Sequence, residues 1–390
     1  MKKEIKRLLR EGLESIITEE KRIKFDVPIP NDIIDIKDVF KKNGHKLYVV
    51  GGAVRDALLG KTPKDYDLAT DATPDKVELM MDKADYRTLP TGKAFGVINV
   101  FTDDDEYEIA TFRKDLSGGR RPDAVEFTTI DQDVKRRDLT INALFYDIDT
   151  GEVVDLVGGI DDIKGSVVRT VGSPEERFGE DRLRILRALR FAGRFGSNLE
   201  PNVDAALNKD SSLEGISKER IRDEFMKGLK TSKSAKYFLG LVDKYNMWGE
   251  IFPGLSINKK YIDDKDGIVN IATLLKDNDV KKLRNVLNKL TYSNDEVKNI
   301  DFLIKLNDID ADDIYQLKKM QKGAKLSDKQ ISDYAKHNGL DTRLINTFLN
   351  FNLSVKGGEA MQRYGLTAKD KSKIGQAIKD LENEKFKELL

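Results

Sequence analysis

The sequence predicts an α+β fold, with a mixed sheet in the N-terminal part and only helices in the rest of the chain. Between Leu47 and about residue 156, short apolar or alternating runs lie between glycine-rich and acidic turns, which is typical of strands. From Gly159 to Leu390, apolar residues recur at intervals of three and four, which is typical of amphipathic helices.

The composition excludes several classes of protein. The 390 residues suit about two to four modules with a sizeable core. Lys and Arg together number 68, as do Asp and Glu, so the net charge alone does not indicate a nucleic-acid-binding protein. The chain has no cysteine and only two histidines, which argues against disulfides and against thiolate or multi-histidine metal sites. Without a run of about 18 apolar residues or a secretory signal, we expect a cytoplasmic protein with no membrane span.

The first element is an amphipathic helix expected over residues 1–24, where apolar residues are spaced by three and four. We expect this helix to pack on the domain that follows, and docking to a partner or a membrane surface is the alternative. Val27-Pro28-Ile29-Pro30 ends it. Asn31 or Asp32 is the expected N-cap of a second helix, which runs to about Asn43-Gly44.

The stretch from Leu47 to Thr70 is the one around which the chain is organised. An apolar run, Leu47 to Val50, predicts a buried strand that ends on Gly51-Gly52. A short helical pattern follows, from Ala53 to Leu59. In Asp65-Tyr66-Asp67-Leu68, apolar residues alternate with carboxylates, so a strand would direct both carboxylates to the same face.

Each part of this stretch has an ordinary structural interpretation and a chemical one. Alone, a Gly-Gly pair is most often a turn and an Asp-x-Asp is most often a solvated strand end. Together they suit phosphate chemistry. Asp65 and Asp67, about 7 Å apart along a strand, offer Mg²⁺ the carboxylate oxygens that it prefers beside substrate phosphates. Gly51-Gly52 lets the backbone approach an anion at a helix start.

With Gly-Gly-Ala-Val-Arg-Asp at 51–56 followed by Asp-Tyr-Asp-Leu-Ala-Thr at 65–70, the stretch resembles the nucleotidyltransferase superfamily that includes DNA polymerase beta. More closely, it resembles the class II tRNA nucleotidyltransferase (CCA-adding enzyme) and bacterial poly(A) polymerase family. The resemblance implies that Asp65 and Asp67 are catalytic and bind Mg²⁺. It also implies that Gly51, Gly52 and Arg55 contact the nucleotide.

A helix opened by Thr73-Pro74 is expected to run through about Met81. Two strands, Phe95–Phe101 and Tyr107–Phe112, are expected to form a hairpin around an acidic turn. Glu108 interrupts the apolar pattern of the second strand. It is either a solvent-facing residue or, as the resemblance implies, the third catalytic carboxylate, which is the interpretation that we favour.

Residues 113–125 carry charges and Ser-Gly-Gly without periodicity, which predicts a mobile loop. The resemblance implies that this loop takes part in the switch from C to A addition. The next motif, Lys135-Arg136-Arg137-Asp138-Leu139-Thr140-Ile141-Asn142, would by default be a solvated helix end. The resemblance implies that it contacts the incoming nucleotide, through Arg137 foremost and also through Asp138 and Asn142. Strands are expected near 143–148 and 152–156, and Gly158-Gly159 is the expected flexible joint behind them.

The segment Glu180 to Arg190 carries the second chemical pattern. On a helix, residues spaced by three form one ridge, and the leucines between them form a second ridge that packs inward. An amphipathic helix with internal ion pairs would explain this. The resemblance implies instead that Asp181 and Arg184 accept cytosine or adenine by their hydrogen-bonding edges, and that Arg187 and Arg190 either bind phosphate or support the first pair. The residues of the first ridge are Asp181, Arg184, Arg187 and Arg190.

The predicted order of domains follows from the change of pattern near residue 157 and, beyond it, from the resemblance. A basic run at Leu317–Lys325 is either a solvated face or a phosphate contact. The domains are an N-terminal leader (1–38), a nucleotidyltransferase head (39–157), a nucleotide-selecting neck (158–232), a body (233–315) and a tRNA-binding tail (316–390).

The resemblance implies template-independent addition of CCA to the 3′ end of tRNA from CTP and ATP, with release of pyrophosphate. It implies two-metal nucleotidyl transfer with Mg²⁺ as cofactor and the acceptor arm of tRNA as partner. Within the superfamily, the alternatives are a poly(A) polymerase and an enzyme that adds only CC or only A. From another class, the alternative is an RNA-binding module without catalysis. The sequence indicates no oligomeric state.

Overall fold

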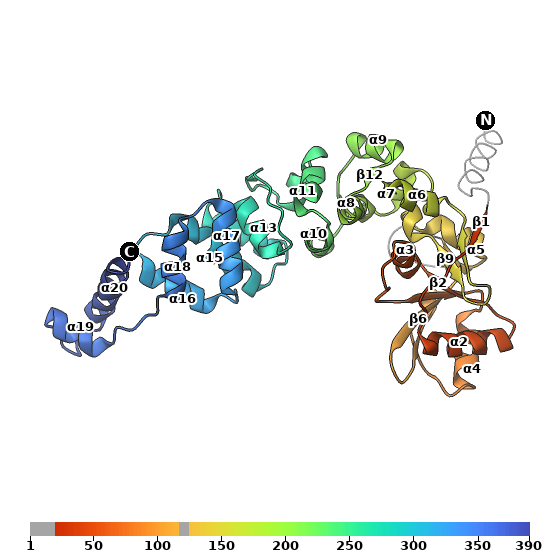
Figure 1. The fold of residues 1–390 in the computed structure, drawn as a ribbon, viewed down its shortest axis with the longest axis horizontal. Helices are drawn as coiled ribbons and strands as arrows, with labels where there is room; N and C mark the ends of the chain where they lie inside the picture. The colour runs from red at the N-terminus through yellow and green to blue at the C-terminus, as the bar shows by residue number, and fades with distance from the viewer. Residues whose placement is uncertain (1–19, 117–124) are drawn as a thin grey trace. The chain divides into compact units, whose positions relative to one another are not determined.

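The structure is a computed structural model that describes residues 20–116 and 125–390. The chain divides into two compact units, Met1–Gly215 and Ile216–Leu390 (Figure 1). The first unit contains a mixed sheet and the second is built from helices, so the predicted α+β class is confirmed. The five predicted domain boundaries are finer than this division and remain predictions. No helix within the described ranges is long and apolar enough to cross a membrane.

Eight strands form the main sheet of the first unit, within the described residues. Only the central pair β3 and β6 is parallel, and the other neighbouring strands are antiparallel. The predicted hairpin and the two strands before Gly158 are therefore confirmed. In spatial order the strands are β1 (Lys21–Lys24), β10 (Glu152–Asp155), β9 (Phe145–Asp147), β2 (Leu47–Val50), β3 (Asp67–Thr70), β6 (Glu106–Thr111), β5 (Val97–Phe101) and β4 (Arg87–Gly92).

The central strand β2 is buried along its whole length, as its apolar run predicts. Leu47 and Val49 join the core on the side of helices α2 (Asn31–Lys42), α3 (Gly52–Leu58) and α4 (Pro74–Asp82). Tyr48 and Val50 join a second core on the opposite face. Figure 1 shows α2 and α4 packed together beside the sheet. A strand between two cores holds the residues at its end, Gly51-Gly52, in a fixed position.

Two expectations near the N-terminus are wrong where the structure describes them. The helix expected over residues 1–24 lies largely outside the described residues, but Lys21–Lys24 form strand β1, because this segment pairs with β10. The N-cap of α2 is Pro30, not Asn31 or Asp32. The carboxylate of Asp32 instead accepts a hydrogen bond from the Tyr107 hydroxyl at 2.8 Å. Asp32 thus ties α2 to the β5–β6 hairpin.

The stem of the predicted loop at 113–125 is a β-ribbon, in contrast to the expectation. Arg113–Asp115 (β7) pairs antiparallel with Val125–Phe127 (β8). The Ser-Gly-Gly centre of the loop lies outside the described residues, so its predicted mobility remains a prediction. In the chain, β7 follows β6 directly, and β8 precedes the short helix α5 (Ile130–Asp133).

Gly158-Gly159, the expected flexible joint, is a packed helix start. The Asp155 carboxylate accepts hydrogen bonds at 2.8–3.0 Å from the amides of residues 157–160, at the start of α6 (Gly159–Gly165). A Cβ atom on Gly159 would lie 2.3 Å from the carbonyl oxygen of Thr140. The glycine is therefore required by close packing within the first unit.

The rest of the first unit is mainly helical. Its helices are α7 (Pro174–Glu180), α8 (Leu183–Phe195) and α9 (Pro201–Lys209), and strands β11 (Val167–Val168) and β12 (Asn198–Leu199) form a small parallel pair. Leu183, Leu186 and Leu189 of α8 are buried, as the predicted inward ridge requires.

Throughout residues 216–390, all of which the structure describes, the regular elements are helices. They are α10 (Lys218–Thr231), α11 (Ala235–Lys244), α12 (Trp248–Ile251), α13 (Gly267–Leu275), α14 (Val280–Lys289), α15 (Asn294–Lys305), a 3-10 turn (Leu306–Asp308), α16 (Ile314–Gly323), α17 (Asp328–Asn338), α18 (Thr342–Asn350), α19 (Gly357–Tyr364) and α20 (Lys371–Lys387).

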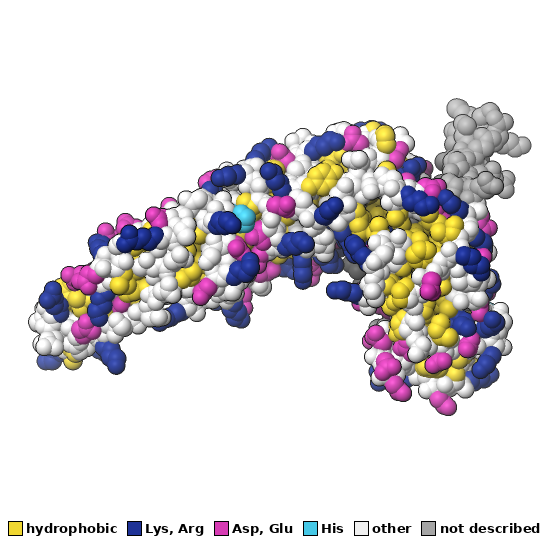
Figure 2. All heavy atoms as spheres, in the orientation of Figure 1, with side chains coloured by type: hydrophobic (Ala, Val, Ile, Leu, Met, Phe, Trp, Pro, Cys, Tyr) yellow, Lys and Arg dark blue, Asp and Glu magenta, His cyan; other side chains and the backbone are white. Residues whose placement is uncertain are grey.

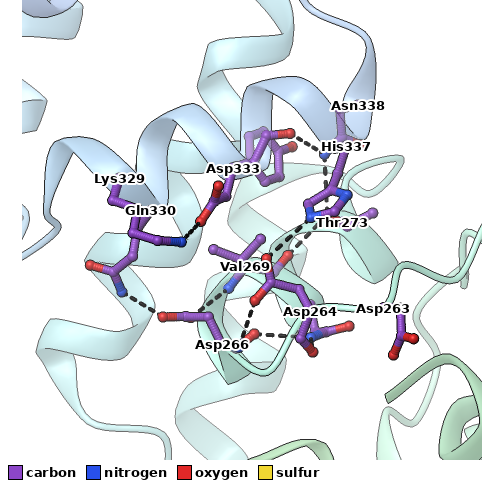
Figure 3. Close-up of polar contacts among 12 residues, drawn as sticks. Asp263, Asp264, Asp266, Val269, Thr273, Lys329, Gln330, Asp333, His337 and Asn338 are labelled. Atoms are coloured by element: carbon purple, nitrogen blue, oxygen red, sulfur yellow. Dashed lines mark hydrogen bonds and ion pairs between the residues drawn. The ribbon is translucent and has the colours of Figure 1, made fainter. Parts of the chain in front are cut away.

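Polar contacts fasten α17 to the start of α13 (Figure 3). His337 Nε2 lies 3.1 Å from Asp264 Oδ2, and Gln330 donates to Asp266, which also caps α13. The basic run at Leu317–Lys325 is only partly a solvated face, because Lys318 is buried and donates to the carbonyl of Phe348 at 2.9 Å. On the face drawn in Figure 2, basic and acidic side chains are interspersed along the second unit, as the balanced composition suggests.

Candidate active site

The three predicted carboxylates lie on, or just before, the neighbouring strands β3 and β6. The expectation that Asp65 and Asp67 share a strand is wrong, because strand β3 begins at Asp67 and Asp65 stands two residues before it. Because β3 and β6 run parallel with Leu68 beside Ile109, Asp67 lies beside Glu108, at the spacing of about 4.8 Å between neighbouring strands. Both carboxylates are on the exposed side, and Leu68 and Ile109 point into the core. Strand pairing thus joins two segments that are distant in the sequence.

The electrostatic surroundings of Asp67 combine opposing effects. Loss of water around the carboxylate raises the pKa of Asp67, Arg137 acts in the opposite direction, and Asp65 adds to the rise. Within the described ranges, no three carboxylate or histidine side chains are gathered into a ready metal site. Asp67 and Glu108, neighbours on β3 and β6, offer the carboxylate oxygens that a hard divalent cation takes as ligands.

The glycine pair stands at the end of β2, beside these carboxylates. Gly51 has a φ angle of +67°, a backbone conformation that residues with a side chain rarely adopt. Its amide donates a hydrogen bond to the Leu144 carbonyl at 2.9 Å. A Cβ atom there would lie 3.4 Å from the Asn142 carbonyl oxygen and 3.9 Å from Arg137 Nη1. Gly51 therefore allows the turn between β2 and α3 to approach the segment that carries Arg137 and Asn142.

Arg55 is buried, with 4% of its surface exposed. Its Nε donates to Asp56 Oδ1 at 2.9 Å, and its Nη1 donates to Asn142 Oδ1. The guanidinium carbon lies 5.3 Å from the ring centre of Phe191 and 5.2 Å from that of Phe195. Burial lowers the pKa of Arg55, the strongest effect on this group, and Asp56 opposes it.

Arg137 is held in place by Asp133, a residue that the sequence analysis missed. Its Nη2 donates to Asp133 Oδ2 at 3.0 Å, and its guanidinium lies 4.6 Å from the ring centre of Phe145. Asp133 also accepts from Arg136 and from the amide of Arg113 at the start of β7. Burial raises the pKa of Asp133, but Arg137 and Arg136 outweigh it, so this pKa is held below its usual range.

The predicted ridge of four residues is divided by a break in the helix. Asp181 has extended backbone angles and lies between α7 and α8, so only Arg184, Arg187 and Arg190 share α8. The Asp181 carboxylate accepts from the Leu183 amide at 3.1 Å, at the start of α8. The i to i+3 spacing conceals this break, because it continues across the junction.

The arginines of α8 contact the basic motif at 135–142. Arg184 donates to the carbonyl oxygens of Arg177 and Arg136, both at 3.1 Å, and also pairs with Glu180. Arg187 Nε donates to Asp138 Oδ2 at 2.8 Å. Asp138 in turn accepts a long hydrogen bond, 3.4 Å, from Asn142. The structure thus brings the two basic motifs together, although 49 positions separate Asp138 from Arg187.

The sequence analysis missed four residues that share one property. The side chain of each contacts a predicted site residue, either Arg55 or Arg137. Asp133 follows a recognisable pattern, an acid four positions before an arginine. Phe191 and Phe195 are also four positions apart on α8 and stack with ring centres 6.0 Å apart. The residues are Asp56, Asp133, Phe191 and Phe195.

Two families of known proteins match the chain. Residues 47–169 match the family described as the Poly A polymerase head domain, and residues 198–258 match the one described as a probable RNA and SrmB-binding site of polymerase A. These matches cover the carboxylates, the glycine pair and the basic motif at 135–142.

Curated relatives match over about half of the chain. The CCA-adding enzyme of Bacillus subtilis (strain 168) is 45% identical over 203 residues, which are 51% of this chain and 50% of the relative. The CCA-adding enzyme of Enterococcus faecalis is 42% identical over 208 residues, 52% of this chain and 50% of the relative. The matched part of the chain spans about half the length of these relatives.

Solved structures share the fold over nearly the whole chain. The Bacillus stearothermophilus CCA-adding enzyme in complex with CTP has a TM-score of 0.65 at 24% identity, and 92% of each chain is covered. The Thermotoga maritima CCA-adding enzyme complexed with tRNA_CCA has a TM-score of 0.69 at 20% identity, and 95% of each chain is covered.

Proposed function

We propose that this chain adds C, C and A to the 3′ end of tRNA, as a member of the class II CCA-adding enzyme and poly(A) polymerase family. The match of residues 47–169 to the head-domain family and the likeness of about half of the chain to CCA-adding enzymes support this proposal. The substrates are CTP and ATP. In each step the terminal 3′-hydroxyl of the tRNA attacks the α-phosphorus of the nucleotide, and pyrophosphate leaves. The observation that carries the proposal is the parallel pairing of β3 with β6, which places Asp67, the first residue of β3, beside Glu108.

We assign Asp65 and Asp67 to Mg²⁺ and to the triphosphate, and Glu108 to the reacting 3′-hydroxyl. When bound, Mg²⁺ makes the hydroxyl more acidic and neutralises charge on the triphosphate and the leaving group. Arg137 stands between Asp133 and the turn at Gly51, at a position suited to the phosphates. Gly51, Gly52 and Arg55 complete this side of the nucleotide site.

Choice of the base belongs, in this proposal, to Asp181 and Arg184. A carboxylate accepts from the exocyclic amino group that cytosine and adenine share, and a guanidinium donates to ring nitrogen or carbonyl acceptors. Arg184 is fixed by two backbone carbonyls and Glu180, so its donors have a defined direction. Arg187 and Arg190, together with Asp138 and Asn142, support this pair. The protein then does the work of a template strand.

The helical second unit is assigned to the acceptor arm of tRNA, in keeping with the tRNA complex of the Thermotoga maritima fold relative. We propose that it contacts the acceptor arm mainly through the phosphates and the A-form shape of the RNA. With tRNA as the substrate, we assign the protein to the cytoplasm.

The test is incubation of the full chain with tRNA that lacks its 3′ CCA, with CTP alone, ATP alone, UTP alone, GTP alone, and CTP with ATP. The proposal predicts two C residues from CTP alone and a complete CCA end from the mixture. A run of many A residues would support a poly(A) polymerase. Termination after CC, or addition of A only to tRNA ending in CC, would support the specialised enzymes. Binding of tRNA without any incorporation would support the RNA-binding module.

A further inference from the structure

Two phenylalanines of α8 form a surface on which five cationic side chains meet. Arg190 lies 4.2 Å, Arg55 5.3 Å and Arg187 5.9 Å from the ring centre of Phe191. The second ring, Phe195, has three such neighbours at 5.2–5.7 Å, namely Arg55, Arg194 and Lys61. Arg55 comes from α3, Lys61 from the turn that follows α3, and the other three cations from α8. Each such contact is attractive because the cation lies near the negative face of the ring.

Asp56 connects the same two helices through both of its carboxylate oxygens. Oδ1 accepts from Arg55 Nε at 2.9 Å, and Oδ2 accepts from Arg194 Nη2 at 3.0 Å. Arg194 lies in the last turn of α8, 138 positions after Asp56. The side chains of Asp56 and Arg194 are 19% and 27% exposed, so solvent screens this pair less than a surface ion pair.

This contact joins two parts of the proposed nucleotide site. Helix α3 begins at Gly52, in the turn assigned to the triphosphate, and α8 carries the arginines assigned to the base. One nucleotide has to meet both parts at once, and a misplacement of about 1 Å can cost about 100-fold in rate. The distance between the turn and the arginines therefore has to be fixed by something other than the nucleotide.

We propose that Asp56 and Arg194, with the Phe191–Phe195 pair, are positioning residues that hold α3 against α8, so that the phosphates and the base of one nucleotide are bound in register. The inference rests on the proposed function and adds residues to it that the function does not assign to the base, the phosphates or the metal. Arg194 acts through Asp56, and Asp56 acts through Arg55. Direct binding of tRNA phosphate by Arg194 is the competing role.

The experiment compares Arg194→Gln, Asp56→Asn, the double variant and Arg194→Lys in the full chain. Lys46→Gln is the matched control, because Lys46 pairs with the buried Asp147 at 3.2 Å beside the opposite end of β2 from Gly51. We expect Arg194→Gln to lower kcat/KM for CTP about 10- to 100-fold, mainly through KM for CTP, with KM for tRNA unchanged. The double variant should be no worse than the more impaired single variant, and Arg194→Lys should recover part of the loss.

A rise in KM for tRNA with an unchanged KM for CTP would overturn the proposal in favour of direct tRNA binding. Equal losses in Arg194→Gln and Lys46→Gln would overturn it in favour of a general effect on stability. Failure of the proposed function is recognised separately, because the wild-type protein would then incorporate no nucleotide. In that case, CTP binding by calorimetry replaces the rates, and unchanged CTP affinity in Arg194→Gln would overturn the inference.

Discussion

Arg187 of α8 donates two hydrogen bonds to Oδ2 of Asp138, in the basic motif that precedes it by 49 positions. Burial alone would raise the pKa of Asp138, but Arg187 and the amide of Leu139 outweigh it, so this pKa is held below its usual range. The pair links the helix assigned to the base with the segment assigned to the nucleotide. Its strength can be measured through the pH dependence of folding.

The first prediction concerns Asp138→Asn. A carboxyl whose pKa is lower in the folded than in the unfolded state adds stability above the unfolded value, about 3.9, and loses it as the pH falls through that value toward the folded pKa. We expect the variant to lose about 1.5–3 kcal/mol of unfolding free energy at pH 6. Between pH 5 and 3 the difference from wild type should shrink. Urea unfolding followed by circular dichroism measures both, and a difference that is constant over this range would contradict the interpretation.

The second prediction concerns Gly159. A methyl group there would clash with the Thr140 carbonyl oxygen. We therefore expect Gly159→Ala to lower the unfolding free energy of the first unit by about 1–3 kcal/mol, although alanine has the higher helix propensity. Gly179 in α7 is the matched control, because a Cβ atom there has no neighbour within 4 Å. We therefore expect the midpoint of thermal unfolding to fall in Gly159→Ala and to rise or stay unchanged in Gly179→Ala. Equal destabilisation would show that Gly159 is not required by packing.

The third prediction concerns choice of the base. Arg184→Ala removes donors whose direction is fixed, and a well-placed pair of hydrogen bonds discriminates by roughly 1–3 kcal/mol, or about 5- to 150-fold. We expect the ratio of kcat/KM for CTP over UTP to fall by that factor on tRNA ending before its CCA. Asp181→Ala should likewise relax the preference for bases with the shared amino group.

The control for that experiment is Arg182→Ala. Arg182 stands between the two residues in the chain, but its guanidinium pairs with Asp210 at 2.6 Å. Its loss should leave the CTP-to-UTP ratio unchanged. If Arg184→Ala and Asp181→Ala lower all four rates uniformly, the arginines of α8 bind only phosphate.

The fourth prediction concerns the segment between β7 and β8. Deletion of Leu116 to Gly119 should leave addition of CC largely intact and reduce addition of the final A, if this segment takes part in the switch between the two nucleotides. The measurement is the 3′ end composition of the product by sequencing. Equal loss of both steps would indicate a folding defect or a different role.

Much of the fold was predictable, because local patterns agree with the final structure. Four consecutive apolar residues predict the buried strand Leu47–Val50, and the acidic turn between two alternating runs predicts the β5–β6 hairpin. Where tertiary pairing overrides the local pattern, prediction failed. Lys21–Lys24 continue a helical pattern but form β1, because they pair with β10 at the edge of the sheet.

The site was predictable as a set of residue types but not as an arrangement. The position of Glu108 beside Asp67 depends on a parallel pairing that no local pattern shows. Asp181 leaves the helix although its spacing to Arg184 fits a helical ridge. Asp56 and Phe195 belong to no catalytic or binding motif in the sequence. Their proposed role depends on tertiary contacts, of Asp56 with Arg194 in α8 and of Phe195 with Arg55 in α3, which the sequence does not show.

The account depends most on the assignment of Asp67 and Glu108 to nucleotidyl transfer, and the rate of C addition in Asp67→Asn, Glu108→Gln and Glu106→Gln tests it most directly. Glu106 is the matched control, because it is also exposed on β6 but pairs with Phe101, two residues away from the position beside Asp67. Loss of an outer-shell partner of a metal already costs about 10- to 100-fold, so loss of a direct ligand should exceed about 100-fold. We predict such a loss for Asp67→Asn. For Glu108→Gln we predict a loss of about 100-fold or more, because this carboxylate is assigned to the proton of the reacting 3′-hydroxyl. Binding of tRNA should be unchanged in both variants, and Glu106→Gln should keep a near wild-type rate. A rate within a few-fold of wild type in Asp67→Asn, or equal losses in Glu108→Gln and Glu106→Gln, would contradict the account.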